Sequence, residues 1–165
     1  MINRILFASD LGLYGPYLMR LVADLAQSTG ASVDILHVIE PMGVFAESVI
    51  DSYMPEKEKE YLRNKGLAEI ISKIRLQVID TLKSEYSGYL DMINLADVLV
   101  EVGEPANLIL EHANLRKSDM IVLAVHGQQG FGANVVGSIV IKVIKDSIVP
   151  VYILPMVSLS ELDRS

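Results

Sequence analysis

A short apolar run leads into a glycine-rich loop and the start of a helix in Met120-Ile-Val-Leu-Ala-Val-His-Gly-Gln-Gln-Gly-Phe-Gly-Ala-Asn-Val-Val-Gly-Ser138. Residues 120–125 are apolar at every position, which is typical of a strand buried on both faces in a parallel sheet. Four glycines follow in the eleven residues from Gly127 to Gly137. Because a helix start presents free N–H groups and a positive dipole end, this segment predicts an anion-binding turn suited to a phosphate.

The glycines also allow a plainer interpretation, in which they form only a turn and Ser138 is an ordinary N-cap. The segment is not a Walker A loop, because no Gly-Lys followed by Ser or Thr occurs in the chain, and it is not a Gly-x-Gly-x-x-Gly motif. On the glycines alone, both interpretations stay open.

Four other short runs, rich in Val and Ile, resemble the run before the loop. The predicted strands cover residues 5–8, 33–39, 97–102, 120–125 and 149–154. Segments of helical period separate them, with helices predicted over 17–28, 105–114 and 137–145. In the last of these helices we expect Ile141 and Ile144 to face inward. The alternation of strand and helix predicts one doubly wound, Rossmann-like α/β domain with helices on both faces of the sheet.

One segment, from Pro41 to Leu90, is roughly twice as long as a strand crossover requires. The charge run at 55–60 is interpreted as a solvated first turn, and a long amphipathic helix follows. Its apolar residues in helical register are Leu67, Ile70, Ile71, Ile74, Val78, Ile79 and Leu82. Two interpretations stay open for residues 42–54, a mobile flap over a site or a disordered loop.

The composition excludes several classes of function. The chain of 165 residues contains no Cys, so it has neither a disulfide framework nor a cysteine nucleophile, and its three His show no metal-ligand spacing. A net charge of −7 argues against nucleic acid and anionic membranes as partners. The apolar runs are too short to span a bilayer and no signal peptide is recognised, so we expect a cytoplasmic protein.

The chain resembles the universal stress proteins of the single-domain type over nearly its whole length. Four segments carry the resemblance: Ile5-Leu-Phe-Ala-Ser-Asp10, Ile35-Leu-His-Val38, Val102-Gly-Glu-Pro-Ala106 and Ser118-Asp-Met-Ile-Val-Leu-Ala-Val-His-Gly127. Nucleotide-binding members carry Gly, two residues, Gly, nine residues, then Gly and Ser or Thr. Gly127, the nine-residue spacer and Gly137-Ser138 match this motif, whereas Ala124 replaces its first glycine.

The resemblance implies a parallel sheet in the order 3-2-1-4-5, with residues 1–157 as the family domain and 158–165 as a tail. It places the ligand where the strand order reverses, between the first and fourth strands. The site residues that it implies are Ala8, Asp10, Val38, Ala124, His126, Gly127, Gly137, Ser138 and Ile139. Adenine would lie near Val38, Asp10 beside the adenosine, and the glycines and Ser138 at the ribose and phosphates.

Departures from the family pattern fall on the phosphate end of this site. Gln128 and Gln129 stand where relatives often carry Arg or Lys, and Val140 replaces a frequent hydroxyl residue. Neutral amides lack the charge assistance that roughly doubles the strength of a hydrogen bond. Recognition of adenosine or AMP is therefore expected to persist while affinity for a triphosphate falls.

Two functions remain in competition at this point. The first is a regulatory dimer of the stress response that binds ATP, ADP or AMP, with Mg²⁺ accompanying ATP. The second is a dimeric interaction protein with a vestigial phosphate loop, working through the long second helix. No nucleophile–base pair or carboxylate pair is recognised, so catalysis would be at most a slow ATP hydrolysis. The strand Pro150-Val-Tyr-Ile-Leu-Pro155 would be an exposed edge in a monomer, and the family pairs this strand across a twofold axis, which predicts a homodimer.

Overall fold

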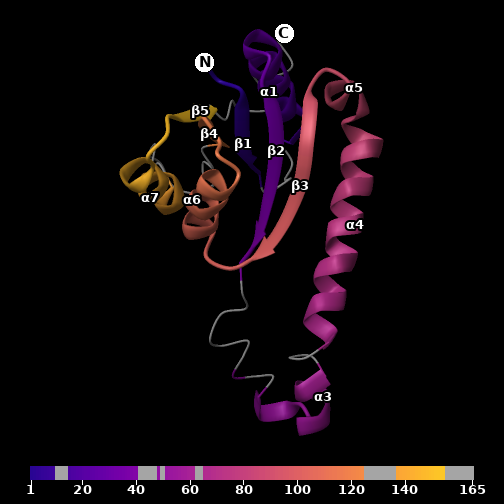
Figure 1. Ribbon diagram of the computed structural model, residues 1–165. Helices are drawn as coiled ribbons and strands as arrows, with labels where there is room; N and C mark the ends of the chain where they lie inside the picture. The colour runs from indigo at the N-terminus through magenta and orange to yellow at the C-terminus, as the bar shows by residue number, and fades with distance from the viewer. Residues whose placement is uncertain (10–14, 41–47, 49–50, 62–64, 125–136, 155–165) are drawn as a thin grey trace, which may run out of the picture.

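Five parallel strands form a single sheet in the order β3-β2-β1-β4-β5 (Figure 1). This computed structural model describes residues 1–9, 15–40, 48, 51–61, 65–124 and 137–154. The strands are β1 (Arg4–Ala8), β2 (Ser32–Ile39), β3 (Asn94–Val102), β4 (Met120–Ala124) and β5 (Val151–Leu154). The predicted strand order and parallel pairing are therefore confirmed.

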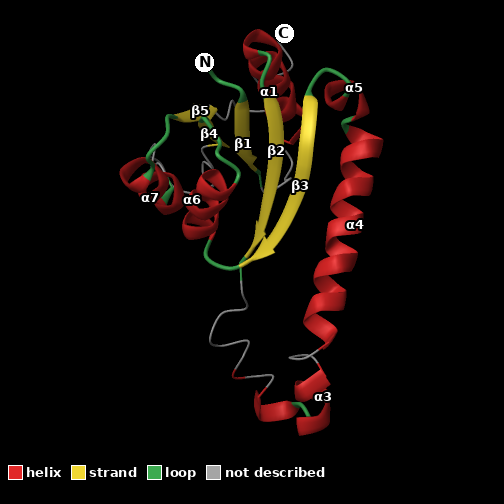
Figure 2. Cartoon of the chain, viewed as in Figure 1, coloured by secondary structure: helices red, strands yellow, loops and turns green. Residues whose placement is uncertain are grey.

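Helices cover both faces of the sheet (Figure 2). On one face, α1 (Gly15–Thr29) and α4 (Leu67–Glu85) share an apolar cluster with residues of β1, β2 and β3. On the other, α6 (Pro105–Leu115) and α7 (Ser138–Asp146) pack over a second cluster. The short helices α3 (Glu56–Tyr61) and α5 (Ser87–Leu90) flank the two ends of α4. The continuous apolar strands follow from this double coverage, because both faces of each central strand are buried.

The orientation of α7 differs from the prediction. Val140 and Val143 are buried against the sheet, whereas Ile141 and Ile144 are 54% and 49% exposed. The expectation that the two isoleucines face inward was therefore wrong. The two valines and the two isoleucines form apolar pairs with the same three-residue spacing. The isoleucine pair is shifted by one residue along the helix, and this shift rotates the apolar face by about 100°. Periodicity alone does not choose between the two pairs.

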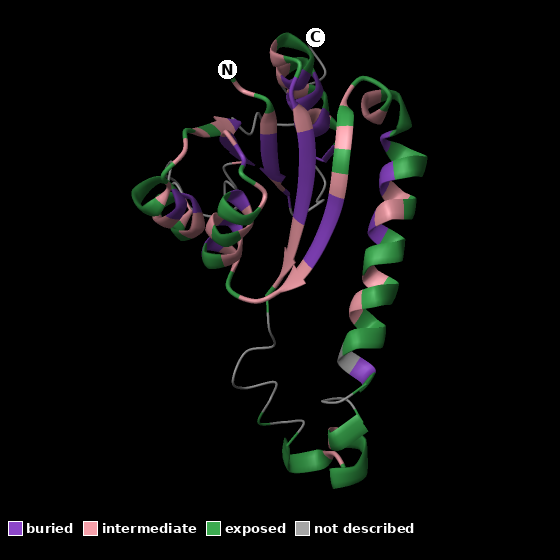
Figure 3. Cartoon of the chain, in the orientation of Figure 1, coloured by how far each residue is buried: buried purple, intermediate pink, exposed green. Residues whose placement is uncertain are grey.

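The long helix α4 packs along only part of its length. Val78 and Leu82 are buried under α1 and β3, but Ile70 and Leu76 are 45% and 67% exposed. Figure 3 shows exposed and intermediate residues along the half of α4 nearer α3, apart from a buried position next to its start. The charged segment expected as a solvated first turn forms the separate helix α3, which has no buried residue. Most of the proposed flap at 42–54 lies outside the described residues.

The two strands β2 and β3 continue beyond the end of β1. The last pair between β1 and β2 joins Ala8 to Leu36, while β2 stays paired with β3 through Ile39. Three residues of β2 thus extend past β1, and among the described strands they pair only with β3. This extension forms a wall beside the carboxyl end of β1, and Val38 lies on it.

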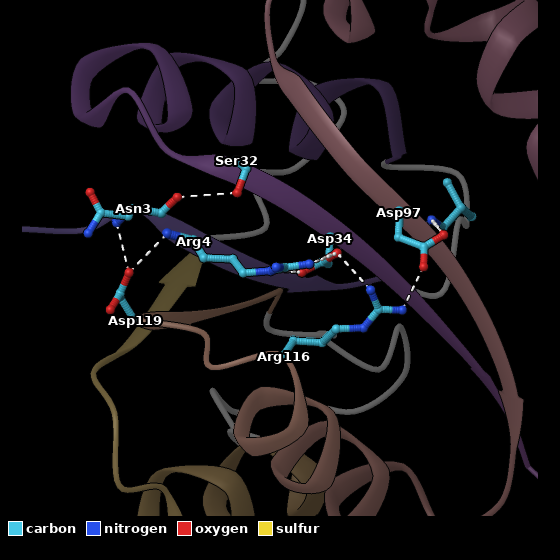
Figure 4. Close-up of polar contacts among 8 residues, drawn as sticks. Asn3, Arg4, Ser32, Asp34, Asp97, Arg116 and Asp119 are labelled. Atoms are coloured by element: carbon cyan, nitrogen blue, oxygen red, sulfur yellow. Dashed lines mark hydrogen bonds and ion pairs between the residues drawn. The ribbon is translucent and has the colours of Figure 1, made fainter.

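A charged network fixes the opposite, amino-terminal end of the sheet (Figure 4). Asp34 of β2 is fully buried, and its two carboxylate oxygens accept hydrogen bonds of 2.6 and 3.0 Å from Arg4. Arg116, which follows α6, lies 3.7 Å from Asp34 and donates a 2.6 Å hydrogen bond to Asp97 of β3. Asp34 and Asp97 occupy paired positions of neighbouring strands, so the arginine separates two carboxylates that would otherwise repel each other.

The same network shifts the pKa of two of its members. Partial burial raises the pKa of Asp97, but hydrogen bonds from Arg116 and the Val98 backbone N–H outweigh it and leave the pKa below its usual range. The hydrogen bond to Asp34 raises the pKa of Arg4. Both shifts favour the charged forms, so the network persists as a set of ion pairs near neutral pH.

Candidate functional site

The strand order reverses at the carboxyl ends of β1 and β4, the position at which open α/β sheets form a ligand-binding crevice. These two strands are hydrogen-bonded neighbours, with Ala8 paired to Leu123, yet their connections run to opposite sides of the sheet. The chain leaves β1 for β2 on one side and leaves β4 for β5 on the other. Because the following segments diverge, a parallel sheet is open at this point, and this is where α/β proteins of this kind bind ligands.

The described site residues lie on three elements around this opening. Ala8 and Ala124 end β1 and β4, and both are half-buried. Val38 lies on the extension of β2, the strand next to β1. Gly137 is the N-cap of α7, Ser138 is its exposed first residue, and Ile139 packs against the α6–α7 cluster. Asp10, His126 and Gly127 lie outside the described residues, as do Gln128 and Gln129.

The first turn of α7 has no side-chain cap. Gly137 has an extended backbone, with φ −57° and ψ 150°, and its carbonyl accepts the first helical hydrogen bond from Ile141 at 3.1 Å. A glycine at the N-cap has no side-chain oxygen for the free N–H groups of this turn. The start of α7 therefore presents backbone donors and the positive end of a helix dipole without a competing anion from its own cap.

The neighbouring helix α6 shows the contrasting arrangement. Its N-cap Glu104 accepts hydrogen bonds from the backbone N–H groups of Ala106 and Asn107, at 3.3 and 2.8 Å. The Asn107 N–H and, more weakly, Lys142 at 3.3 Å hold the pKa of Glu104 below its usual range. The carboxylate thus occupies the anion-binding end of α6, whereas the N-cap Gly137 supplies no side-chain acceptor to the corresponding end of α7.

Val140, which stands where the resemblance leads us to expect a hydroxyl residue, packs in the apolar core. Its side chain is 5% exposed and lies in the cluster between α7, α6 and the sheet. A hydroxyl residue at this position would bring a polar group into that cluster. The apolar residue is therefore explained by local packing as well as by any change in the phosphate site.

The two described histidines and Asp119 have different surroundings. Nδ1 of His37 lies 3.0 Å from the carbonyl oxygen of Ser9, and the residue is half-buried. Nε2 of His112 lies 3.5 Å from a carboxylate oxygen of Glu101, in agreement with a partly exposed structural role. Asp119 accepts hydrogen bonds of 2.8 and 3.0 Å from the backbone N–H groups of Asn3 and Arg4 at the amino end of β1, away from the candidate site.

Two further observations restrict the chemistry of the described part of the chain. Among those residues, no group of three or more His, Asp or Glu side chains is arranged to hold a metal ion. None of the helices in the described ranges is both long and apolar enough to cross a membrane. Among the described residues, the groups at the ends of β1 and β4 and at the start of α7 are small side chains and backbone N–H groups.

These features define a doubly wound α/β domain in which α7 begins near the switch point of the sheet. The sequence profile of the universal stress protein family matches residues 1–155, and the chain belongs to this family. It is 28% identical to the universal stress protein YxiE of Bacillus subtilis over 154 residues, covering 93% of this chain and 99% of YxiE.

Solved structures agree with this assignment. Hypothetical protein MJ0577 superposes with a TM-score of 0.65 and 25% identity, covering 96% of this chain and 99% of that protein. A universal stress protein from Archaeoglobus fulgidus in complex with dAMP superposes with a TM-score of 0.55 and 19% identity, covering 93% of this chain and 98% of the other. At such identity the second likeness establishes the fold alone.

Proposed function

We propose that this protein binds an adenine nucleotide at the carboxyl ends of β1 and β4 and acts as a regulatory homodimer in the cytoplasmic stress response. The observation that carries the proposal is the uncapped start of α7, at the Gly137-Ser138 end of the family's glycine spacing. The arrangement supplies neutral backbone donors to a phosphate, which suits a surface whose net charge is −7. The complex of an Archaeoglobus fulgidus relative with dAMP supports an adenine ligand.

The nature of the site favours a monophosphate over a triphosphate. A helix start and one Ser hydroxyl contact one phosphate, whereas the additional charge of a triphosphate requires cations. Gln128 and Gln129 supply none, and Lys142 of α7 is paired with Glu104. We therefore propose AMP as the tighter ligand, with ATP bound more weakly and only together with Mg²⁺. Hydrolysis would be at most slow.

Gly137 offers a clean test of nucleotide binding. Its backbone conformation suits any residue, and a Cβ added there would meet no atom of the described residues within 4 Å. Gly137→Val should therefore fold with an unchanged melting temperature, while its branched side chain obstructs a phosphate at the helix start. Titration calorimetry with AMP, ADP and ATP, with and without Mg²⁺, should show binding to the wild-type protein and at least a tenfold loss in the variant. Unchanged nucleotide affinity in a folded Gly137→Val would show that the nucleotide does not bind at this helix terminus.

The homodimer would form through the exposed edge of β5. Within this strand Tyr152 is 46% exposed, and just before it Ile148 is 88% exposed. An unpaired edge with exposed apolar residues favours pairing with a second copy. Sedimentation should give about twice the 18.2 kDa chain mass at micromolar concentration. Tyr152→Glu should shift the mass to that of the monomer without unfolding the chain, whereas a monomeric wild-type protein would contradict the dimer.

A second candidate function is that of a dimeric interaction protein with a vestigial nucleotide site. The specific observation in its favour is the exposure of Ile70 and Leu76 on the part of α4 that projects toward α3. Native mass spectrometry of freshly purified protein separates the two functions. Co-purified adenine nucleotide would support the first, and an empty dimer that binds no nucleotide at millimolar concentration would support the second.

A further inference from the structure

The end of β1 is held to β2 by two different hydrogen bonds. Just after β1, the backbone N–H of Ser9 donates to the carbonyl of Leu36 in β2 at 3.0 Å. One position farther on, Nδ1 of His37 lies 3.0 Å from the carbonyl oxygen of Ser9. The peptide unit at Ser9 is thus fixed on both sides of the residue, first by backbone and then by an imidazole ring.

The hydrogen-bond partner of Nδ1 determines which nitrogen of the His37 ring carries the proton. A carbonyl oxygen can only accept a hydrogen bond, so the proton of the neutral imidazole must be on Nδ1. Nε2 then carries a lone pair and is free to accept. The geometry requires one specific tautomer of His37, which can be observed directly.

The position of this bond connects it with the crevice. The carbonyl of Ser9 belongs to the peptide that leads into position 10, and Ala8 on the other side ends β1 at the floor of the opening. His37 lies on the extension of β2 beside Val38, which among the described strands pairs only with β3. A donor at this point determines where the chain leaves the sheet. Because ligand contacts here are made by backbone and small side chains, the placement of the strand end sets their geometry.

We propose that His37 is a positioning residue of the nucleotide site, in which Nδ1–H donates to the Ser9 carbonyl and fixes the carboxyl end of β1 for the ligand. This inference rests on the nucleotide-binding function proposed above. It extends that function by assigning a role to a residue on the wall of the crevice. His37 acts through Ser9 and need not touch the ligand.

Three substitutions separate this role from direct contact with the ligand. Asn places its amide nitrogen close to the position of Nδ1 and can replace the donor to Ser9. Gln extends its amide toward the position of Nε2, and Phe keeps the ring shape with no donor at all. His37→Asn should bind AMP within about twofold of wild type, whereas His37→Gln and His37→Phe should weaken binding about five- to tenfold, the equivalent of one hydrogen bond.

Amide hydrogen exchange at Ser9 provides a readout that does not depend on any ligand. The exchange rate should rise in His37→Phe and His37→Gln and stay near the wild-type value in His37→Asn, because only the first two lose the bond beside this amide. Nitrogen-15 NMR of the wild-type imidazole should show the proton on Nδ1. Thermal unfolding of each variant establishes that the chain is folded. If His37→Phe does not fold, His37→Gln replaces it as the variant without the donor to Ser9.

The possible outcomes are distinct. Unchanged AMP affinity and unchanged Ser9 exchange in a folded His37→Phe or His37→Gln would overturn the positioning role. Full affinity in His37→Gln with loss in His37→Asn would also overturn it, because the ligand would then contact Nε2. A wild-type protein that binds no adenine nucleotide would refute the proposed function and the ligand part of this inference, while Ser9 exchange would still decide whether His37 holds the end of β1.

Discussion

Replacing Asp34 with asparagine should lower the free energy of unfolding by about 3 kcal/mol. The carboxylate is fully buried and accepts two hydrogen bonds from Arg4, with Arg116 at 3.7 Å. Removing one partner of a buried ion pair costs about 3–5 kcal/mol because the remaining charge is left without compensation. Here the arginine side chains are 32% and 28% exposed and can regain some hydration, so we take the lower end of this range.

Asparagine is the informative substitution because it preserves the shape of the side chain. Its oxygen can keep one hydrogen bond from Arg4, but its amide group turns two donors toward a guanidinium that also only donates. Urea unfolding monitored by circular dichroism measures the change through the transition midpoint. For a chain of this length, 3 kcal/mol corresponds to a fall in melting temperature of about 6–12 °C.

Asp97 provides the matched control within the same network. It is the register partner of Asp34 and also pairs with Arg116, at 2.6 Å, but its side chain is 34% exposed. Asp97→Asn should therefore cost less than about 1 kcal/mol, as is usual for ion pairs near the surface. Equal effects of the two substitutions, or a loss below about 1 kcal/mol for Asp34→Asn, would show that burial does not set the energy of this network.

Three further substitutions test local features of the fold. Gly15→Ala should destabilise the chain by about 1–3 kcal/mol, because the added Cβ would overlap the hydroxyl of Tyr86; a change below about 0.5 kcal/mol in urea unfolding would refute the overlap. Lys117→Gly should stabilise it by about 0.5–1 kcal/mol, because φ is 54° there, and the same assay would contradict this if stability fell. Two backbone N–H groups lower the pKa of Asp119, so its contribution to stability is present above the unfolded-state pKa and is lost as pH falls through the folded-state pKa. Asp119→Asn should therefore flatten the decrease in melting temperature on acidification below about pH 4, and an unchanged acid profile would count against the bonds.

The fold was predictable because its main signal is repeated along the chain. Each of the first four strands is short, largely apolar and followed later in the chain by a helix of clear period, so errors in one element do not change the class of architecture. The orientation of α7 was not predictable in the same way, since Ile141 and Val140 each begin an apolar pair of identical spacing. Which pair is buried depends on how the helix packs against α6 and the sheet, and this contact is not written in a local pattern.

The sequence contains a signal for the charged network, namely a carboxylate within a predicted buried strand. Asp34 stands inside a run that is otherwise apolar and predicted to be buried, and a buried carboxylate requires a partner. Identifying that partner requires the strand register, because Arg4 and Arg116 are distant in sequence and meet Asp34 only in the folded sheet. The candidate site was placed by topology, because its residues follow the ends of strands that the fold brings together. Their contact with a ligand stays a prediction.

The two ends of the sheet consequently depend on different parts of the chain. At the amino end, side-chain charges fix β1 against β2 and β3, and single substitutions such as Asp34→Asn should be costly there. At the carboxyl end, the described site residues are Ala8, Val38, Ala124, Gly137, Ser138 and Ile139, and of these only Ser138 has a polar side chain. The backbone groups among them can bind a ligand only from the places where the strands and the helix end. Residues that set those endpoints, as we propose for His37, should therefore influence the ligand more than exposed charges nearby.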